Sequence, residues 1–296
     1  MVRPAATRRG RAASGRSAKG AAAKPAAADA SPATPAAEIH GFAGDPNFMA
    51  SLARGLAVIR GFTQQRGRLT IAQLAQRTGI PRAAARRCLY TLAKLGYVAT
   101  EDGRTYALRP RILALGHAYL SSTPLATAVQ PLLDQLSSEL HESSSMAVLE
   151  ADEILYIARS STTTRLMSID LGIGSRLPAY CTSMGRALLA GLSPADLDAY
   201  LSRAKLTKLT SRTVSEPAEL KTVLNAVRRA GFAIVDQELE IGLRSIAVPV
   251  TDPSGKVVAA INVGTQSSRV SVAEMEQKFL PRLQAAAREL GLLLGA

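Results

Sequence analysis

The chain has 296 residues, 47% of them hydrophobic, which is enough for two domains that each bury a core. No apolar run reaches the roughly 18–20 residues needed to cross a bilayer, and no apolar signal segment follows the basic N-terminus. The two cysteines, Cys88 and Cys181, lie far apart in the sequence. We therefore expect no disulfide framework, no membrane contact and a reducing, cytoplasmic location.

Positive charge is concentrated in the N-terminal third of the chain. Between Phe48 and Arg111, twelve basic residues accompany only two acids, Glu101 and Asp102, so this segment carries a net charge of +10. The tail before it carries +4, and the chain from Ile112 onward carries −1. This distribution is typical of a small polyanion-binding module joined to a nearly neutral globular body.

Residues 1–47 are rich in Ala, Pro and Arg and lack apolar periodicity. They bury too little apolar surface to offset the entropy of ordering, so we expect a disordered basic tail. Two interpretations remain open from the sequence. The tail is either an extension without a role or a segment that helps to hold DNA phosphates.

Residues 48–110 have the pattern of three helices and a hairpin. A first helix is expected from a cap at Ser51 to about Gly67, and a second from a cap at Thr70 to Gly79. The third helix starts at Pro81 and ends near Leu95, and its apolar face consists of Ala85, Leu89 and Leu92. Strands at 97–99 and 106–108, with a turn at 101–103, complete a winged helix-turn-helix.

The third helix places its basic residues away from its apolar stripe. Arg82 and Arg86 are four residues apart and therefore neighbours on one helical face, which suits entry into a major groove. Arginine forms bidentate contacts with guanine or phosphate. An ordinary solvated face is the alternative. The residues expected to bind DNA are Thr70, Arg82, Ala83, Arg86 and Arg87, with Arg104 and Arg109 of the wing.

The remainder is expected to contain a linker helix at 111–123 and a second domain at 124–296. A helix should follow Thr123-Pro124 and run to about His141. Strands are expected at 145–150, 153–159, 165–170, 232–237, 245–251 and 257–264. Helices are expected at 182–191, 194–203, 217–230 and 272–294, the last kinked at Pro281. Strand runs on either side of a helical insert indicate an antiparallel sheet flanked by helices, in the α+β class.

The sequence contains no convincing set of catalytic or metal-ligating residues. The three histidines have no partner at metal-ligand or triad spacing, so we expect no cofactor, no metal and no enzymatic activity. Cys181 precedes a helix and is either a reactive thiol or a small buried residue. The alternating acids Asp236, Glu238 and Glu240 have either an acid–base role or, as we prefer, a structural or ligand-contacting one.

Four motifs, in this order and spacing, resemble the IclR-type transcriptional regulators. They are 52–59 (LARGLAVI), 71–75 through 92–97 (IAQLA to LAKLGY), 176–190 (RLPAYCTSMGRALLA) and 242–250 (GLRSIAVPV). The resemblance covers residues 48–294 and implies a winged helix-turn-helix, a linker helix and a GAF-like effector-binding domain. Within that family, 165–172 (RLMSIDLG) followed by 177–183 (LPAYCTS) is similar to regulators of aromatic-acid breakdown through the β-ketoadipate pathway.

The resemblance also implies an effector pocket between the sheet and the helix after the Leu-Pro motif. Carried over by matching motif, its residues are Arg165, Leu166, Ile169, Ser183, Met184, Asp236, Ser245, Asn262 and Gly264. Many family members have Cys where this chain has Ser245, which leaves a hydroxyl in place of a thiol. Backbone N–H groups at a helix start suit a carboxylate, and either Arg165 or Arg176 is a candidate for an additional positive charge.

We therefore expect a nucleoid-associated regulator, a homodimer or dimer of dimers, whose partners are double-stranded operator DNA and a small organic acid. RNA polymerase is a further expected partner. The acid would shift DNA binding or polymerase contact by its different affinity for two conformations. The alternatives are an enzyme on a GAF-like scaffold with an accessory DNA-binding module, and an architectural DNA-binding protein that takes no ligand.

Overall fold

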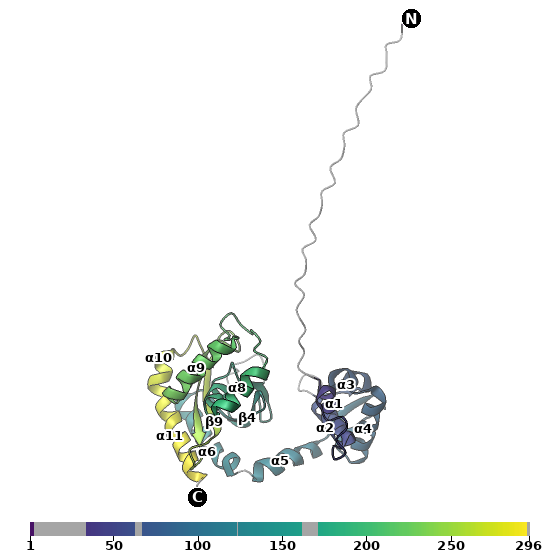
Figure 1. Ribbon diagram of the computed structural model, residues 1–296, viewed down its shortest axis with the longest axis horizontal. Coiled ribbons are helices and arrows are strands. Elements are labelled where there is room, and N and C mark those ends of the chain that lie inside the picture. Colours follow the sequence, from purple (N-terminus) through teal and green to yellow (C-terminus); the bar gives the residue numbers. More distant parts are fainter. Residues whose placement is uncertain (3–33, 63–66, 123, 162–170, 295–296) are drawn as a thin grey trace. The chain divides into compact units, whose positions relative to one another are not determined.

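The protein is described by a computed structural model that covers residues 1–2, 34–62, 67–122, 124–161 and 171–294. Its internal contacts divide the chain into two units, Met1–Pro110 and Arg111–Ala296, which are treated in turn (Figure 1). The strand expected at 165–170 lies outside the described residues, as do Arg165, Leu166 and Ile169.

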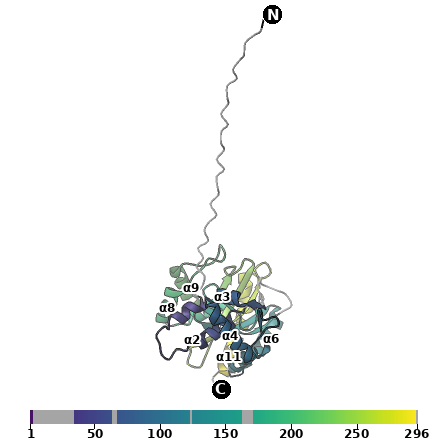
Figure 2. The same ribbon diagram turned by 90° about the vertical axis from the view of Figure 1, so that its right-hand side faces the viewer.

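The N-terminal unit contains the expected winged helix-turn-helix. Its elements are α1 (Pro35–His40), α2 (Ala50–Arg60), β1 (Leu69–Thr70), α3 (Ile71–Thr78), α4 (Arg82–Lys94), β2 (Val98–Ala99) and β3 (Thr105–Leu108). The views in Figures 1 and 2 agree in placing α2 beside α4. The three strands form an antiparallel sheet in the order β1-β3-β2. The sequence did not indicate β1, because two residues are too few to show an alternating pattern.

Local chemistry sets the ends of α3. The Thr70 hydroxyl accepts a hydrogen bond from the Gln73 backbone N–H at 3.2 Å, and the Thr70 N–H donates to Gln73 Oε1 at 2.9 Å. This reciprocal pair is a capping box and satisfies donors that the first helical turn leaves free. At the other end Gly79 has φ of 71°, the left-handed conformation that ends helices and that glycine adopts without strain. The expected cap and stop of this helix are confirmed.

The start of α2 differs from the prediction. Met49, not Ser51, is the N-cap residue, and the Ala53 N–H already donates to the Met49 carbonyl at 3.1 Å. Ser51 therefore lies inside the first turn and does not cap the helix. The helix also ends at Arg60, before Gly61, rather than near Gly67.

The expectation of a disordered tail up to residue 47 is wrong at its C-terminal end. Residues 35–40 form α1, whose Ala36 and Ile39 pack against the core of the N-terminal unit. The segment has only these few apolar side chains, so its own sequence shows no periodicity. A neighbouring hydrophobic surface, formed by residues distant in sequence, supplies the burial that orders it.

A 3₁₀ turn, Pro110–Ile112, spans the boundary between the two units, and the helix α5 (Leu113–Ser122) follows it in the C-terminal unit. None of the residues of α5 is buried. The remaining elements are α6 (Pro124–Leu140), β4 (Ser143–Glu150), β5 (Glu153–Ser160), β6 (Arg176–Pro178), α7 (Ser183–Ala190), α8 (Pro194–Arg203), α9 (Pro217–Ala230), β7 (Ala233–Asp236), β8 (Leu243–Thr251), β9 (Val257–Gln266), α10 (Val272–Glu274) and α11 (Leu280–Leu293).

The six strands that the structure describes in this unit form one antiparallel sheet in the order β6-β5-β4-β9-β8-β7. The α+β class with an antiparallel sheet flanked by helices is thereby confirmed. In the described part of the chain, no single helix is both long and apolar enough to span a membrane. The helices Pro110–Ser122 and Leu125–Leu140 meet that criterion only as a pair, and they are bent by 86°.

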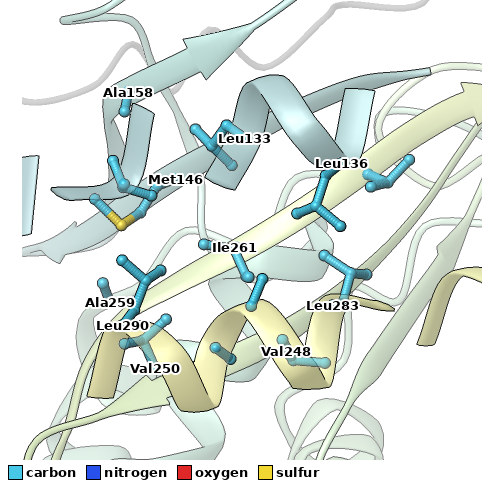
Figure 3. Close-up of a cluster of buried hydrophobic side chains, with 14 of the residues drawn as sticks. Leu133, Leu136, Met146, Ala158, Val248, Val250, Ala259, Ile261, Leu283 and Leu290 are labelled. Carbon is cyan, nitrogen blue, oxygen red and sulfur yellow. The ribbon is translucent and has the colours of Figure 1, made fainter. Parts of the chain in front are cut away.

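The two faces of the sheet carry separate hydrophobic cores. On the α11 face, Leu133 and Leu136 of α6 and Leu283 and Leu290 of α11 enclose aliphatic strand residues such as Ile261 (Figure 3). On the opposite face, which we call the α7 face, Ala147, Ala247 and Ala260 pack with residues of α7, α8 and α9. The small strand residues allow α7 to lie close to the sheet.

The final helix does not simply kink at Pro281. A π-helical turn, Met275–Phe279, separates α10 from α11, and Pro281 lies in the first turn of α11. Proline is tolerated there because N–H groups of the first turn have no acceptor within the helix. The break in the regular helix therefore precedes the proline.

Candidate functional site

Helix α4 presents a basic surface on the side opposite its core contacts. Ala85, Leu89 and Leu92 are buried, whereas Arg82, Ala83, Arg86 and Arg87 are exposed. Gly79 ends α3 and Pro81 is the N-cap residue of α4, so Arg82 is the first residue of α4. In helix-turn-helix proteins, the N-terminal end of the recognition helix is the part that contacts base edges in the major groove.

The arginines of α4 differ from Arg60 and Arg68 in their ion pairing. Arg60 and Arg68 elsewhere in the unit pair with Glu38 at 3.2 Å and Glu101 at 2.7 Å. Arg82, Arg86 and Arg87 form no such pair with any residue that the structure describes. Their guanidinium groups therefore retain their full capacity for phosphate or base contacts.

A short turn fixes the wing. Asp102 Oδ1 accepts hydrogen bonds from the backbone N–H groups of Thr105 at 2.7 Å and Arg104 at 2.8 Å. These bonds hold the pKa of Asp102 well below its usual range, so the carboxylate stays charged at neutral pH. Arg104 at the turn and Arg109 after β3 are both exposed, as expected for residues that touch the DNA backbone.

Thr70 has an internal role instead. Its hydroxyl accepts from the Gln73 N–H and also lies 3.1 Å from Gln73 Oε1. Both contacts belong to the capping box of α3. Among the seven residues predicted to bind DNA, Thr70 is thus the one whose polar group is already used within the domain.

We expect Arg86→Ala to weaken operator binding by about 1–3 kcal/mol if this guanidinium reads a base. The measurement is an equilibrium titration of a labelled operator duplex at fixed salt. Arg288→Ala is the matched control, because it removes the same charge from an exposed position of α11. Equal operator affinities for the two variants would contradict the assignment of Arg86.

In the C-terminal unit, several expected effector residues share the α7 face of the sheet. Ser145 of β4 pairs with Asn262 of β9, and Ser245 of β8 pairs with Gly264 of β9. Directly opposed residues point to the same face. Asn262 and Gly264 alternate with Ile261 and Val263, which belong to the core on the α11 face. The polar residues therefore project towards α7.

Helix α7 packs on this face of the sheet. Its N-cap is Thr182, whose hydroxyl accepts from the Gly185 N–H at 3.2 Å. Ser183 and Met184 form the first turn, and both are buried. An added Cβ at Gly185 would stand 2.1 Å from the Ala179 carbonyl oxygen, so only glycine permits this close approach. The helix packs against β4, β8 and β9.

Two buried polar atoms, one on α7 and one on the α7 face of the sheet, have no hydrogen-bond partner among the described residues. They are Ser183 Oγ, on a residue that is 1% exposed, and Asn262 Oδ1, on a residue that is 9% exposed. Buried polar groups in native proteins are nearly always hydrogen-bonded, so each exception asks for an explanation. A polar ligand held between α7 and the sheet would provide the missing partners.

Sequence reasoning missed Arg159, which lies on the same face. A β-bulge shifts the register between β4 and β5, so Met146 pairs with Ala158 but Ala147 pairs with Tyr156. Arg159 consequently pairs with Ser145 and joins the α7 face. It is partly buried and forms no ion pair with a described residue. A guanidinium in this position is suited to a ligand carboxylate.

The arginine considered from the sequence, Arg176, is already engaged. Its guanidinium contacts Glu153 at 2.7 Å and Glu150 at 2.9 Å. It therefore stands at the sheet edge in an ion-pair network. The other arginine considered, Arg165, lies outside the described residues together with Leu166 and Ile169.

Asp236 departs from the predicted arrangement. It pairs with Arg244, whereas its neighbour Val235 pairs with Ser245, so Asp236 points to the α11 face and away from the other polar residues. Its carboxylate contacts Arg244 at 2.8 Å and Arg212 at 2.6 Å. The hydrogen bond from Arg244 is the main cause that holds the pKa of Asp236 below its usual range. Side chains of β7 alternate between the two faces of the sheet, so Asp236 lies on the face opposite the other polar residues. An isolated sequence motif does not show this alternation.

Two further chemical candidates, Glu238 and Cys181, have structural roles. Glu238 forms a buried bidentate ion pair with Arg186 of α7, both N–O distances being 2.6 Å. Burial raises the pKa of the Cys181 thiol to about 12, so this cysteine is a neutral, unreactive core residue at neutral pH. In the described part of the chain no group of three His, Cys, Asp or Glu residues is placed to hold a metal ion.

The sequence and fold together identify the class of protein. Residues 51–102 match the IclR helix-turn-helix domain, and residues 117–292 match the model described as "Bacterial transcriptional regulator IclR C-terminal". The second match alone covers more than half of the chain. The chain therefore belongs to the IclR family of bacterial transcriptional regulators.

Its relatives include regulators named for aromatic-acid genes. The chain is 60% identical to the Pca regulon regulatory protein of Pseudomonas putida over 258 residues, which is 87% of this chain and 88% of that protein. It is 36% identical to the p-hydroxybenzoate hydroxylase transcriptional activator of Acinetobacter baylyi over 248 residues, 82% of this chain and 91% of the relative.

Solved structures of the family have the same fold. An IclR-family regulator from Brucella abortus has a TM-score of 0.70 and 26% identity, over 84% of this chain and 93% of that one. An IclR homologue from Microbacterium hydrocarbonoxydans in complex with 4-hydroxybenzoate also has a TM-score of 0.70 and 26% identity. That comparison covers 82% of this chain and 98% of the homologue.

Proposed function

We propose that this regulator binds operator DNA through α4 and its wing, under the control of a small organic acid bound between α7 and the sheet. The observation that carries the effector half of the proposal is a cross-strand row on the α7 face, the partly buried Arg159, Ser145 and Asn262, whose Oδ1 is unsatisfied, as is Ser183 Oγ of α7. In this arrangement a ligand carboxylate pairs with Arg159. A ligand hydroxyl donates to Asn262 Oδ1, and the Ser183 hydroxyl donates to a ligand hydroxyl or keto oxygen.

The chemistry of this group of residues favours an aromatic acid or an intermediate of the β-ketoadipate pathway. Such ligands join one or two carboxylates to an apolar ring or chain. The names of the Pseudomonas and Acinetobacter relatives and the 4-hydroxybenzoate complex of the Microbacterium homologue support the same class. The acid acts as an effector, with different affinities for two arrangements of the protein that differ in operator or RNA polymerase contact.

The proposed assembly is a homodimer or a dimer of dimers that acts on nucleoid DNA in the bacterial cytoplasm. Helix α5 supports a second copy, because Leu113, Leu115 and Tyr119 are exposed on it and none of its residues is buried within the chain. Exposed apolar side chains on a helix are typical of a subunit interface. Two-fold symmetry would place two α4 helices on operator half-sites separated by whole turns of DNA.

A ligand screen tests this function. We expect the C-terminal transition of the purified protein to rise in temperature with one of protocatechuate, 4-hydroxybenzoate or β-ketoadipate, since a ligand selective for the folded state stabilises it. The gain is about 2.7 kcal/mol at a hundred times Kd. The amide of the active acid is the control and should give a much smaller shift.

An operator titration with and without the active acid completes the test. A change in operator affinity or in polymerase recruitment supports effector control. Chemical turnover of the acid would instead favour an enzyme on this scaffold. Stabilisation by none of the acids, combined with unchanged operator binding, would favour an architectural DNA-binding protein.

A further inference from the structure

Tyr90 is exposed on the basic face of α4. It is 65% exposed, although the preceding residue, Leu89, is fully buried. Tyr90 comes seven residues after Ala83, which is close to two helical turns, so the two residues lie on one line along the helix. Arg86 and Arg87, four and three residues before Tyr90, are its neighbours on the same exposed surface. An aromatic ring therefore stands among arginines that point away from the domain core.

Lys94, in the next turn of α4, holds the ring of Tyr90. Its ammonium nitrogen lies 5.5 Å from the centroid of the Tyr90 ring, within the range of a cation–π contact. The contact limits the rotamers of both side chains, so the phenol hydroxyl and the ammonium group are presented together. Neither group has a hydrogen-bond or ion-pair partner among the described residues. Both are therefore available as donors to a ligand.

The charge around Tyr90 selects the kind of partner. Residues 82–94 (RAAARRCLYTLAK) contain three arginines, one lysine and no acid, so α4 carries 4 − 0 = +4. The three arginines form no ion pair with a described residue, which leaves this charge uncompensated on the surface of the unit. A second copy of the chain that met this face with its own would oppose like charges, at a cost of several kcal/mol. A polyanion is the complementary partner.

The place of Tyr90 along α4 indicates which part of a duplex it meets. Arg82 begins the helix, and Tyr90 follows eight residues later, about 12 Å further along the helix axis. The N-terminal part of a recognition helix contacts base edges, and the C-terminal end of such a helix contacts the DNA backbone in homeodomains. Tyrosine and lysine side chains are regular donors to phosphate oxygens. Tyr90 and Lys94 therefore suit the backbone rather than the bases.

We propose that Tyr90 and Lys94 form a phosphate clamp, in which the phenol hydroxyl and the ammonium group donate hydrogen bonds to backbone oxygens of the bound operator. The inference rests on the proposed function, because it takes α4 as the DNA-reading helix. Neither residue reads sequence, since the backbone offers the same phosphate groups at every base pair. The phosphate clamp adds affinity for every duplex that α4 enters, and Arg82 and Arg86 discriminate between bases.

The test starts with the sites that the unmodified full-length chain selects from a random duplex library. Dissociation constants are then measured on the enriched site and on single-base variants of it. Enrichment of no sequence would contradict the proposed function itself. An enriched site whose binding is independent of Tyr90 and Lys94 would contradict the phosphate clamp alone.

Tyr90→Phe removes the hydroxyl but keeps the ring that Lys94 contacts. We expect it to bind the enriched site roughly 10-fold to 100-fold more weakly, the effect of losing a hydrogen bond to a charged acceptor. The loss should be the same on every single-base variant of the site. Thr91→Val is the matched control, because the exposed Thr91 hydroxyl already donates to the Arg87 carbonyl at 3.1 Å. Equal affinities for the two variants would overturn the phosphate clamp, as would a loss that depends on the base sequence.

Lys94→Gln tests the other half of the phosphate clamp. We expect the log–log dependence of operator affinity on salt to become shallower by about 0.9, the effect of one lost phosphate contact. Lys256→Gln is the control, because Lys256 is exposed in a turn of the C-terminal unit, and it should leave the slope unchanged. Equal slopes for the two variants would contradict the phosphate contact of Lys94.

Sedimentation of Tyr90→Ala separates DNA contact from subunit contact. Because Tyr90 is exposed and its face carries uncompensated positive charge, we expect this variant to keep the mass of the unmodified assembly. A smaller assembly would place Tyr90 in an interface between copies of the chain and would overturn the phosphate clamp.

Discussion

Replacing Glu238 with glutamine is expected to lower the free energy of unfolding of the C-terminal domain by about 3–5 kcal/mol. Glu238 and Arg186 are 9% and 3% exposed and are joined by two bonds of 2.6 Å. Removing one partner of a buried ion pair leaves the other charge buried and uncompensated. Glu238 also accepts a hydrogen bond from the Val214 N–H at 3.0 Å, so the same change weakens the attachment of the 204–216 loop.

Denaturant unfolding followed by circular dichroism measures this loss in the transition of the C-terminal domain. Asp198→Asn is the matched control, because it removes a carboxylate that pairs with Lys221 on the surface. An exposed pair contributes roughly 0–1 kcal/mol. A Glu238→Gln variant as stable as Asp198→Asn would show that the buried pair does not hold α7 to the strand end.

Replacing Arg159 with glutamine should weaken binding of the effector acid by about 2–5 kcal/mol, or roughly 30-fold to several thousand-fold. The carboxylate would lose its charged partner within a partly buried site. Arg159 forms no ion pair with the described residues, so the variant should unfold at nearly the same temperature as the unmodified chain in the absence of ligand. Calorimetric titration with the acid identified by the thermal screen gives the change in Kd.

Arg176→Gln provides the matched control for this experiment. It removes the same charge from β6, but the guanidinium of Arg176 is occupied by Glu150 and Glu153. We expect its acid affinity to be unchanged and the affinity of both variants for the neutral amide to be similar. Loss of acid binding in Arg176→Gln, with normal binding in Arg159→Gln, would move the carboxylate site to the edge of the sheet.

The features that sequence reasoning recovered depend on residues close together in the chain. The capping box of Thr70 and Gln73 and the left-handed Gly79 are local, so their residue types alone place the ends of α3. The buried stripe Ala85, Leu89 and Leu92 follows from helical periodicity, which also assigns the exposed arginines to the opposite side. The winged helix-turn-helix was predictable for these reasons.

The effector group was predictable only in part. Asn262, Ser245 and Gly264 lie on the α7 face of the sheet, and Ser183 lies in the first turn of α7, while their contact with an effector stays a prediction. Asp236 does not lie on the α7 face, because the alternation of β7 directs it to the other face. The partner of Arg186 lies 52 residues further along the chain, and no spacing rule connects residues that far apart.

By itself, therefore, the sequence determined the winged helix-turn-helix pattern, the caps of α3, the exposed basic side of α4 and the family. Only the tertiary structure decided which arginines of the C-terminal unit form ion pairs with described residues, as Arg176 does and Arg159 does not. Tyr156 and Arg159 lie on the same face although they are three residues apart, because the bulge opposite Met146 and Ala147 interrupts the two-residue alternation of β5. Docking of α1 was decided in the same way, by a core surface that residues 34–47 meet only once the rest of the domain is folded.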